Sequence, residues 1–497
     1  MGLREKAVRG IGWSAAQNWG NKAIKFAFFL VLAWFLDPAA IGLVALAGVY
    51  VSLVKVFVDQ GFVDALVQRD ELQPAHLDTA FWTNLGLGAA FAGLSVWLAG
   101  PVAQFFEWAG QTALVDSAVS YHAGGASLDG LIRGLSPAFV LAALVGVQEA
   151  VFERDLDYRV LALRALVARV VGGSVGIAMA AAGFGAWSLV GYQLAERTVA
   201  ALVLWTASSW RPRLRWRSAR FRELFAFGIN VVGANLLGFF ERRSDVVIVA
   251  FLGPTAVGLY EVARRILRAV TQLFMQTIST VVFSAFSRLQ DEPERARQGF
   301  YSTTRAVSLV ALPLFIGGAV LAPELFGTFF RAKYGPGAPV FRMLMLLGVL
   351  HAGFYFNGAV MRAMGRPGWK LALNGLNAAA GIGAMLLALP YGVVGVAAAY
   401  TLRAYLLAPV SFLAVRRLIG VSARAYLGVY RTPLLASALM AAGTGAVRAV
   451  LPENAGPAVV LAAGVAIGSA IYAGAVWLIE PKRLARLQGL AREFAPL

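Results

Sequence analysis

The sequence has no cysteine among its 497 residues and only three histidines. The lack of cysteine excludes disulfide bonds, thiol nucleophiles and thiolate metal ligands. The histidines, His76, His122 and His351, stand far apart in the sequence, which disfavours a metal site built on imidazole. Charged residues are also scarce, at 14% of the chain against 59% hydrophobic residues. Such a composition excludes a soluble globular protein.

Long apolar segments fill most of the chain, which has a mean hydropathy of +0.69. We count roughly 14 such segments, each long enough to cross a hydrocarbon core of about 30 Å. The pattern predicts an all-α polytopic membrane protein with little chain left for a soluble domain. The predicted helices lie near residues 11–36, 40–59, 79–106, 126–149, 161–182, 185–207, 224–252, 255–283, 301–323, 338–363, 369–390, 393–416, 432–451 and 456–479.

Basic residues outnumber acidic residues by 44 to 26 and gather in alternate connections between the predicted helices. The most basic connection contains Arg211, Arg213, Arg215, Arg217, Arg220 and Arg222. The intervening connections, such as 183–185 and 390–392, are short and nearly free of Lys and Arg. By the positive-inside rule both termini are therefore cytoplasmic. The net charge of +18 then reflects membrane topology and not binding to nucleic acid.

An internal repeat divides the chain. Residues 36–43 and 252–259 both read Leu-x-Pro-x-Ala-x-Gly-Leu, and each lies in the first connection of a predicted group of six helices. The match predicts two six-helix lobes in a parallel pseudo-repeat around a central cavity. The alternative is that Pro-x-x-x-Gly is only a favourable helix–helix turn. The expected division is an N-lobe at 1–210, an Arg-rich cytoplasmic linker at 211–223, a C-lobe at 224–420, and two additional C-terminal helices with a tail at 421–497.

A stripe of polar side chains marks the predicted helix after Pro254. The members of the stripe are Glu261, Arg264, Arg265, Arg268, Gln272 and Gln276, which share one helix face. A charge at the centre of a bilayer costs about 2.5 to 3.5 kcal/mol on insertion scales, so three arginines in one span are expected to line a water-filled cavity. A cationic cavity indicates an anionic cargo. The alternative is that Glu261 and Arg265 form an ion pair that only makes insertion tolerable.

Other predicted helices carry polar residues that could face the same cavity. The candidate substrate-binding residues are Asn18, Asn21, Lys22, Lys25, Lys55, Arg242, Arg243, Arg264, Arg265, Arg268 and Gln272. The candidate ion-coupling residues are Asp59, Asp245 and Glu261. Lys55 and Asp59, four residues apart, could instead neutralise each other. Arg222, Arg305 and Arg362 lie near predicted helix ends, where we expect their side chains to extend to the lipid headgroups.

Five short segments carry a resemblance to a known family. They read Ala-Leu-Val-Gln-Arg at 65–69 with Thr-Ala-Phe-Trp-Thr-Asn at 79–84, Glu-Arg-Asp-Leu-Asp-Tyr at 153–158, Phe-Ser-Arg-Leu-Gln-Asp at 286–291 and Gly-Arg-Pro at 365–367. With these segments in this order, the chain resembles the Wzx-type polysaccharide flippases. That family belongs to the superfamily that also contains lipid II flippases and multidrug and toxin extrusion (MATE) transporters.

The resemblance implies a V-shaped central cavity and an undecaprenyl-diphosphate-linked oligosaccharide as cargo. Lipid II flippases use positive side chains on helices one, two and eight, and Lys25, Lys55 and Arg264 or Arg265 are similar in position here. The implied function is transfer of repeat units from the cytoplasmic to the periplasmic leaflet of the bacterial inner membrane by alternating access, for O-antigen, capsule or exopolysaccharide synthesis. We expect a monomer without a cofactor or metal. Its expected partners are membrane lipids and the polysaccharide polymerase. Whether H⁺ or Na⁺ is a coupling ion stays open.

Two other functions remain as alternatives. An ion-coupled drug or cation antiporter would share the architecture, but members of that group depend on acidic residues in the first helix, where this chain has lysines. A membrane glycan polymerase or ligase would use the same substrate, but it needs a sizeable periplasmic loop. The longest outside connections, near 107–125 and 324–337, are too short for such a loop. We therefore expect a transporter and not an enzyme.

Overall fold

The structure is a computed structural model of the chain. It describes residues 23–480 apart from 60, 70, 113–119, 273, 274, 276, 453 and 454. The chain forms two compact units, residues 1–261 and 262–497. The boundary falls inside a single helix, α10, which runs over Pro254–Thr271. The predicted division into lobes at the Arg-rich segment stays a prediction.

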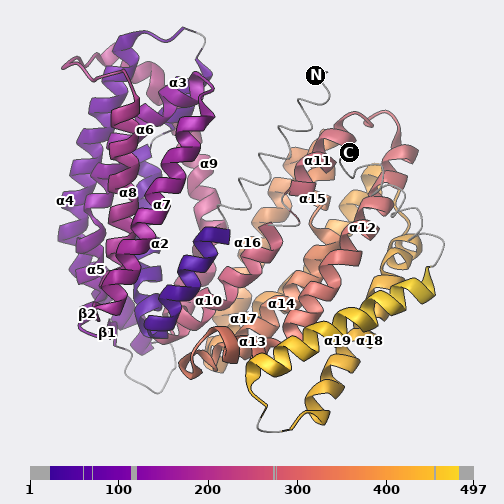
Figure 1. The fold of residues 1–497 in the computed structure, drawn as a ribbon. Coiled ribbons are helices and arrows are strands. Elements are labelled where there is room, and N and C mark those ends of the chain that lie inside the picture. The colour runs from indigo at the N-terminus through magenta and orange to yellow at the C-terminus, as the bar shows by residue number, and fades with distance from the viewer. Residues whose placement is uncertain are drawn as a thin grey trace, which may run out of the picture. The chain divides into compact units, whose positions relative to one another are not determined.

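The first unit is a helical bundle with one small hairpin (Figure 1). Its elements are a helix at Ala23–Phe35, α2 at Pro38–Asp59, α3 at Phe62–Gln68, α4 at Pro74–Thr112, β1 at His122–Ala123, β2 at Ala126–Ser127, α5 at Leu128–Leu135, α6 at Pro137–Arg154, α7 at Tyr158–Ala181, α8 at Trp187–Ala207, α9 at Ser218–Ala250 and the start of α10. The strands pair antiparallel with His122 opposite Ser127. Gly124 and Gly125 form the tight turn between them with φ of 54° and 75°, values that glycine adopts without strain.

The fourth predicted span consists of two helices, α5 and α6, which meet at Ser136 and together form one candidate membrane span at Leu128–Arg154. Ser127 accepts a hydrogen bond from Gly130 N at 3.3 Å and so begins α5, while Pro137 occupies the first turn of α6. Proline has no N–H to give to a preceding turn, so the helix restarts at this point. Asp129 and Arg133, which interrupt the apolar pattern, pair with each other at 3.1 Å.

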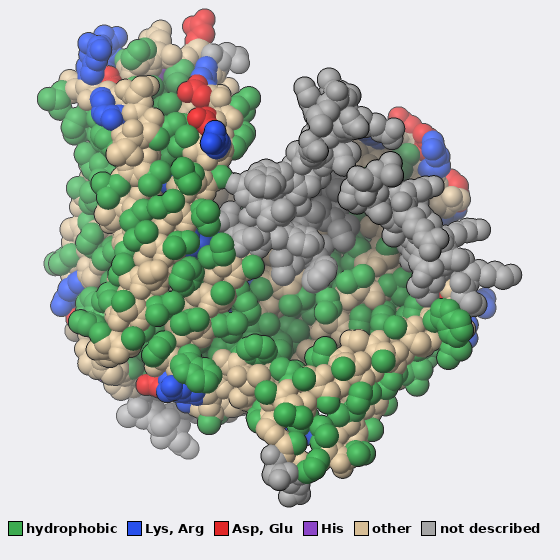
Figure 2. All heavy atoms as spheres, in the orientation of Figure 1, with side chains coloured by type: hydrophobic (Ala, Val, Ile, Leu, Met, Phe, Trp, Pro, Cys, Tyr) green, Lys and Arg blue, Asp and Glu red, His purple; other side chains and the backbone are tan. Residues whose placement is uncertain are grey.

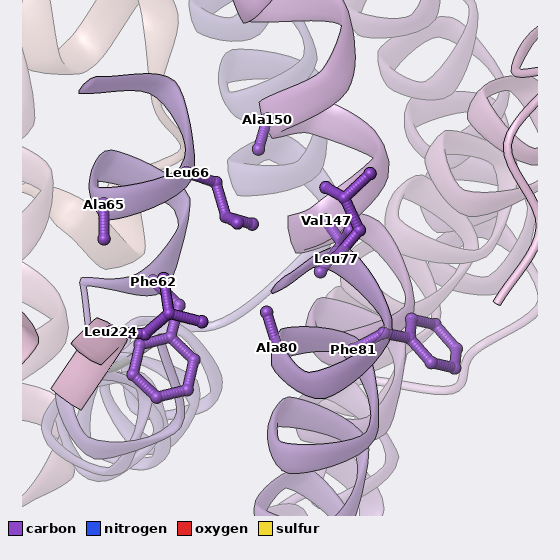
Figure 3. Close-up of a cluster of buried hydrophobic side chains, with 9 residues drawn as sticks. All are labelled: Phe62, Ala65, Leu66, Leu77, Ala80, Phe81, Val147, Ala150 and Leu224. Carbon is purple, nitrogen blue, oxygen red and sulfur yellow. The ribbon is translucent and has the colours of Figure 1, made fainter. Parts of the chain in front are cut away.

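A buried cluster under the short helix α3 joins four elements of the first unit (Figure 3). Its members are Phe62, Ala65 and Leu66 from α3, Leu77, Ala80 and Phe81 from α4, Val147 and Ala150 from α6, and Leu224 from α9. Two of the segments that carry the family resemblance, 65–69 and 79–84, therefore contribute to the same core. Their apolar residues are explained by this packing.

The two copies of the repeat pack against each other within the first unit. Pro38 begins α2 and Pro254 begins α10. A Cβ added at Gly42 would overlap the carbonyl oxygen of Pro254, and a Cβ added at Gly258 would overlap the carbonyl oxygen of Pro38. The two glycines are thus required by a reciprocal backbone contact, because any side chain would force the segments apart.

The second unit is also helical. Its elements are the rest of α10, α11 at Thr277–Ser287, α12 at Pro293–Val320, α13 at Ala322–Phe329, a 3₁₀ turn at Ala332–Tyr334, α14 at Gly337–Phe354, α15 at Asn357–Ala363, α16 at Pro367–Leu387, a 3₁₀ turn at Leu389–Tyr391, α17 at Gly392–Ile419, α18 at Ala423–Val450 and α19 at Pro457–Ile479. Helix α12 packs on α14 and α18, α16 on α17, and α18 on α19. Gln290 Nε2 donates to the Ala363 carbonyl at 2.5 Å, which fastens the 286–291 segment to the end of α15.

The surface of the helices is suited to lipid. In the described part of the chain, 10 helices are long and apolar enough to cross a membrane, or up to 11 if the bent helix α9 is one span. Figure 2 shows hydrophobic side chains along the sides of the first unit, with charged side chains gathered at the end where α3 lies. The predicted helical membrane protein is confirmed. The total of about 14 spans stays a prediction.

Candidate substrate-binding residues

Helix α10 places the predicted stripe on one face. Gly253, with φ of 90°, makes the turn after α9, and Pro254 opens a continuous helix that runs to Thr271. Glu261, Arg264, Arg265 and Arg268 therefore lie on successive turns of one side. Glu261 is buried and the three arginines are partly buried. Gln272 is exposed just beyond the helix, and Gln276 lies outside the described residues.

A buried hydrogen bond fixes the start of this helix against α9. Tyr260, which is fully buried, donates its hydroxyl to Asp245 Oδ2 at 3.1 Å. Asp245 Oδ1 accepts from Val246 N at 2.9 Å. The ion-coupling candidate Asp245 thus holds Tyr260, the residue before Glu261, with one carboxylate oxygen and binds the backbone of α9 with the other. This arrangement explains its burial structurally, and its coupling role stays a prediction.

The remaining candidates are spread over three helices of the first unit. On α9, Arg242 is exposed and Arg243 partly buried. The Arg242 side chain folds back over Gly238, where an added Cβ would lie 2.8 Å from Arg242 Nη1. Lys55 is exposed on α2 and Lys25 on helix Ala23–Phe35. The structure does not describe Asn18, Asn21 and Lys22, nor the side chain of Asp59. The predicted common cavity stays a prediction.

The Arg-rich connection is held to the start of α4 by hydrogen bonds that sequence reasoning missed. The buried carboxylate of Asp78 accepts from Arg213 N at 3.0 Å, and Thr79 Oγ1 accepts from Arg217 N at 3.3 Å. The indole N–H of Trp82 donates to the Arg213 carbonyl at 2.8 Å. Asp78, Thr79 and Trp82 therefore bind the backbone of the Arg-rich connection. The sequence signal for this contact was Asp78, an acidic residue within an apolar segment.

His76 belongs to the same end of the unit. Gln73 N donates to His76 Nδ1 at 3.1 Å, so Nε2 carries the proton and donates to Glu223 Oε2 at 3.2 Å. Glu223 also accepts from Arg69 and from Arg220, the latter at 2.7 Å. The buried histidine thus has a structural explanation in the first turns of α9.

Arg305, which we expect to extend to the headgroups, has an ion-pair partner within the protein, and its location at the headgroups stays a prediction. Its guanidinium pairs with Glu480, at the end of α19, and Thr432 Oγ1 donates to the same carboxylate at 2.6 Å. The pair ties α12 to α18 and α19. Sequence reasoning had no access to it because the partners are far apart in the chain and meet only through packing.

The comparisons with known proteins agree on one family. Residues 31–339 match a family model described as "Polysaccharide biosynthesis protein", which covers more than half of the chain. The chain belongs to this family, and the resemblance stated from the sequence is confirmed.

Two curated relatives and one solved structure are informative. The chain is 27% identical over 347 residues to the succinoglycan biosynthesis transport protein ExoT of Rhizobium meliloti, covering 68% of this chain and 65% of ExoT. It is 24% identical over 374 residues to the lipopolysaccharide biosynthesis protein WzxC of Escherichia coli, covering 74% and 72%. The lipid II flippase MurJ in an inward closed conformation superposes with a TM-score of 0.73 at 12% identity, over 94% of this chain and 99% of MurJ. The similarity to MurJ shows that the two proteins share a fold.

Proposed function

We propose that this protein is a flippase that moves undecaprenyl-diphosphate-linked oligosaccharide repeat units from the cytoplasmic to the periplasmic leaflet of the inner membrane. The membership in a polysaccharide biosynthesis family supports the pathway. The name of ExoT, a transport protein, and the fold shared with a lipid II flippase support transport over enzymatic chemistry.

The observation that carries this proposal is the charged face of α10. Three arginines occupy two turns of a helix in a chain with few charged residues. Guanidinium groups bind phosphate oxygens through paired hydrogen bonds, so a diphosphate matches this face in charge and geometry. A cationic drug would be repelled by it. The same face therefore favours an anionic cargo over drug antiport.

Alternating access is the transport mode that suits this cargo. A bulky polar head has to cross the hydrocarbon while its lipid tail stays outside, which requires a cavity open alternately to each side. The charges of the cargo moving in the membrane potential would supply about 2.3 kcal/mol per charge per 100 mV. Proton or Na⁺ binding at Glu261 is the alternative energy source.

The first test is the leaflet location of lipid-linked repeat units after depletion of this protein. Spheroplasts are treated with a membrane-impermeant glycosidase, and the protected fraction is measured. We expect protected, cytoplasm-facing repeat units to accumulate. Accessible but unpolymerised units would instead identify a polymerase or ligase. If no units accumulate, the flippase proposal fails and drug antiport becomes the leading function.

A charge-reversal variant links the function to α10. We expect Arg265→Glu to abolish export, because the carboxylate repels the diphosphate. Arg288→Glu, at an exposed position beyond α11, is the matched control and should export normally. Equal membrane levels of both variants exclude a folding defect. Normal export by Arg265→Glu would remove this residue from the substrate site.

A further inference from the structure

The second unit contains a charged side chain in the middle of a long apolar helix. Arg403 lies near the centre of α17, within a candidate membrane span at Leu389–Ile419. Its side chain is partly buried. Ionisable residues at such a depth are costly and usually mark a functional site. Sequence reasoning missed this arginine because it stands alone and forms no stripe.

One nitrogen anchors the guanidinium of Arg403 to α16. Nη1 donates to the Asn377 carbonyl at 2.7 Å and to Asn377 Oδ1 at 3.0 Å. The amide of Asn377 is oriented in turn, because its Nδ2 donates to the Leu373 carbonyl at 2.8 Å. The guanidinium carbon also lies 4.6 Å from the ring centroid of Tyr400, one turn earlier on α17. Arg403 is therefore held in one orientation.

The charge of Arg403 is not balanced by these contacts. In the described part of the chain its partners are a backbone carbonyl, an amide and a phenol ring, all of which are neutral. Its Nε is buried and has no hydrogen-bond acceptor there. Buried donors are nearly always satisfied in folded proteins, so an unsatisfied donor on a charged group points to a missing acceptor. A bound anion would supply both the acceptor and the countercharge.

Polar side chains continue from Arg403 along α16 toward the N-terminus of that helix. Lys370, Asn374 and Asn377 are spaced by four and three residues, which places them on one face. Lys370 Nζ donates to Asn374 Oδ1 at 2.5 Å. At Gly381, one turn beyond Asn377, an added Cβ would lie 3.5 Å from the Arg403 guanidinium carbon. That distance is an ordinary van der Waals contact, so the guanidinium packs directly against this turn of α16.

We infer that Arg403, Asn377, Asn374 and Lys370 form a binding track for an anionic group, a phosphate or a carboxylate. With Nη1 anchored, the Nε and Nη2 edge of the guanidinium has the fork geometry that binds such oxygens in pairs. The amides of the asparagines suit neighbouring hydroxyl groups. The inference rests on the proposed function, since a lipid-linked glycan carries these groups. The headgroup of an anionic phospholipid offers the same chemistry.

The test measures binding of two probes to the purified protein in phosphatidylcholine nanodiscs. The probes are undecaprenyl diphosphate, for the cargo, and phosphatidylglycerol, for the headgroup. We expect Arg403→Gln to weaken binding of undecaprenyl diphosphate about tenfold or more, as loss of a charge-assisted hydrogen bond predicts. Arg403→Lys, which keeps the charge but loses the fork, should be intermediate. Arg417→Gln, exposed near the end of the same helix, is the matched control and should bind like wild type.

A second variant separates binding from folding. Asn377→Asp keeps the acceptor at 3.0 Å from Arg403 Nη1 and supplies an internal countercharge. We expect it to fold with at least wild-type thermal stability and still to lose anion binding about tenfold, because the carboxylate competes with the ligand. A merely structural role for Arg403 would leave binding unchanged in Asn377→Asp.

The outcomes are distinct. Loss of undecaprenyl diphosphate binding in Arg403→Gln and Asn377→Asp supports the track as a cargo site, and loss restricted to phosphatidylglycerol assigns it to a lipid headgroup. Wild-type affinity for both probes in both variants would overturn the inference. If depletion of the protein traps no repeat units while the variants still lose anion binding, the proposed function fails and the anion site stands.

Discussion

Substituting one glycine of the repeat tests the reciprocal contact between residues 36–43 and 252–259. In Gly42→Ala the new Cβ would lie 2.7 Å from the carbonyl carbon of Pro254 and 2.9 Å from Gly258 N, and it would overlap the Pro254 oxygen. All three obstacles are backbone atoms, which cannot rotate away. Ordinary contacts between non-bonded heavy atoms are about 3.5 to 4.0 Å, so the overlap with the Pro254 oxygen would require the two segments to part by roughly 2 Å.

The expected cost follows from overpacking against a rigid neighbour. Inserting an extra carbon into a packed interior typically costs about 1 to 3 kcal/mol, and opposition by backbone argues for the upper end. Replacing glycine by alanine within a helix returns about 0.8 to 1 kcal/mol. We therefore expect Gly42→Ala to lower the free energy of unfolding by about 2 kcal/mol. Gly258→Ala should behave alike, because its environment mirrors that of Gly42.

Gly48→Ala is the matched control, because Gly48 lies on the same helix with nothing within 4 Å of an added Cβ. It should be as stable as wild type or more stable by about 0.5 to 1 kcal/mol. Thermal unfolding in detergent, followed by fluorescence of the 12 tryptophans at one scan rate, compares the variants. If Gly42→Ala unfolds at the temperature of Gly48→Ala, the close contact does not exist in the protein. The double variant Gly42→Ala/Gly258→Ala should lose less stability than the sum of the two single variants, because the first alanine already parts the segments.

Two further substitutions test local contacts of the first unit. Asp78→Ala removes the acceptor of Arg213 N. A hydrogen bond to a charged group contributes about 1.5 to 3 kcal/mol, so limited trypsin digestion should then cut the Arg-rich connection about tenfold faster or more. An unchanged cleavage rate would contradict the docking of this segment. Tyr121 donates to the carbonyl of Ala250, the last residue of α9, at 2.5 Å, and burial raises the pKa of Tyr121, so the phenol stays a donor. Below the ordinary pKa of tyrosine, Tyr121→Phe should lower the free energy of unfolding by about 1 kcal/mol, and the difference should shrink at higher pH. Wild-type stability would show that water replaces the bond.

Several features of this protein follow from sequence alone, because they depend on short-range periodicity. Apolar runs of about 20 residues identify membrane helices without any knowledge of their neighbours. The spacing of Glu261, Arg264, Arg265 and Arg268 places them on one face of α10, since the helical repeat is a property of the backbone. The turn residues Pro38 and Pro254 likewise mark helix starts.

Other features were decided only by the tertiary structure, because they join residues that are distant in the chain. The pairing of Arg305 with Glu480 and the docking of Arg213 on Asp78 depend on which helix ends meet. The repeated glycines were visible in the sequence, but only packing shows that each receives the carbonyl of the other copy's proline. A single arginine such as Arg403 has no periodic signal at all. Its neutral partners, and hence its unbalanced charge, exist only where α16 and α17 lie side by side.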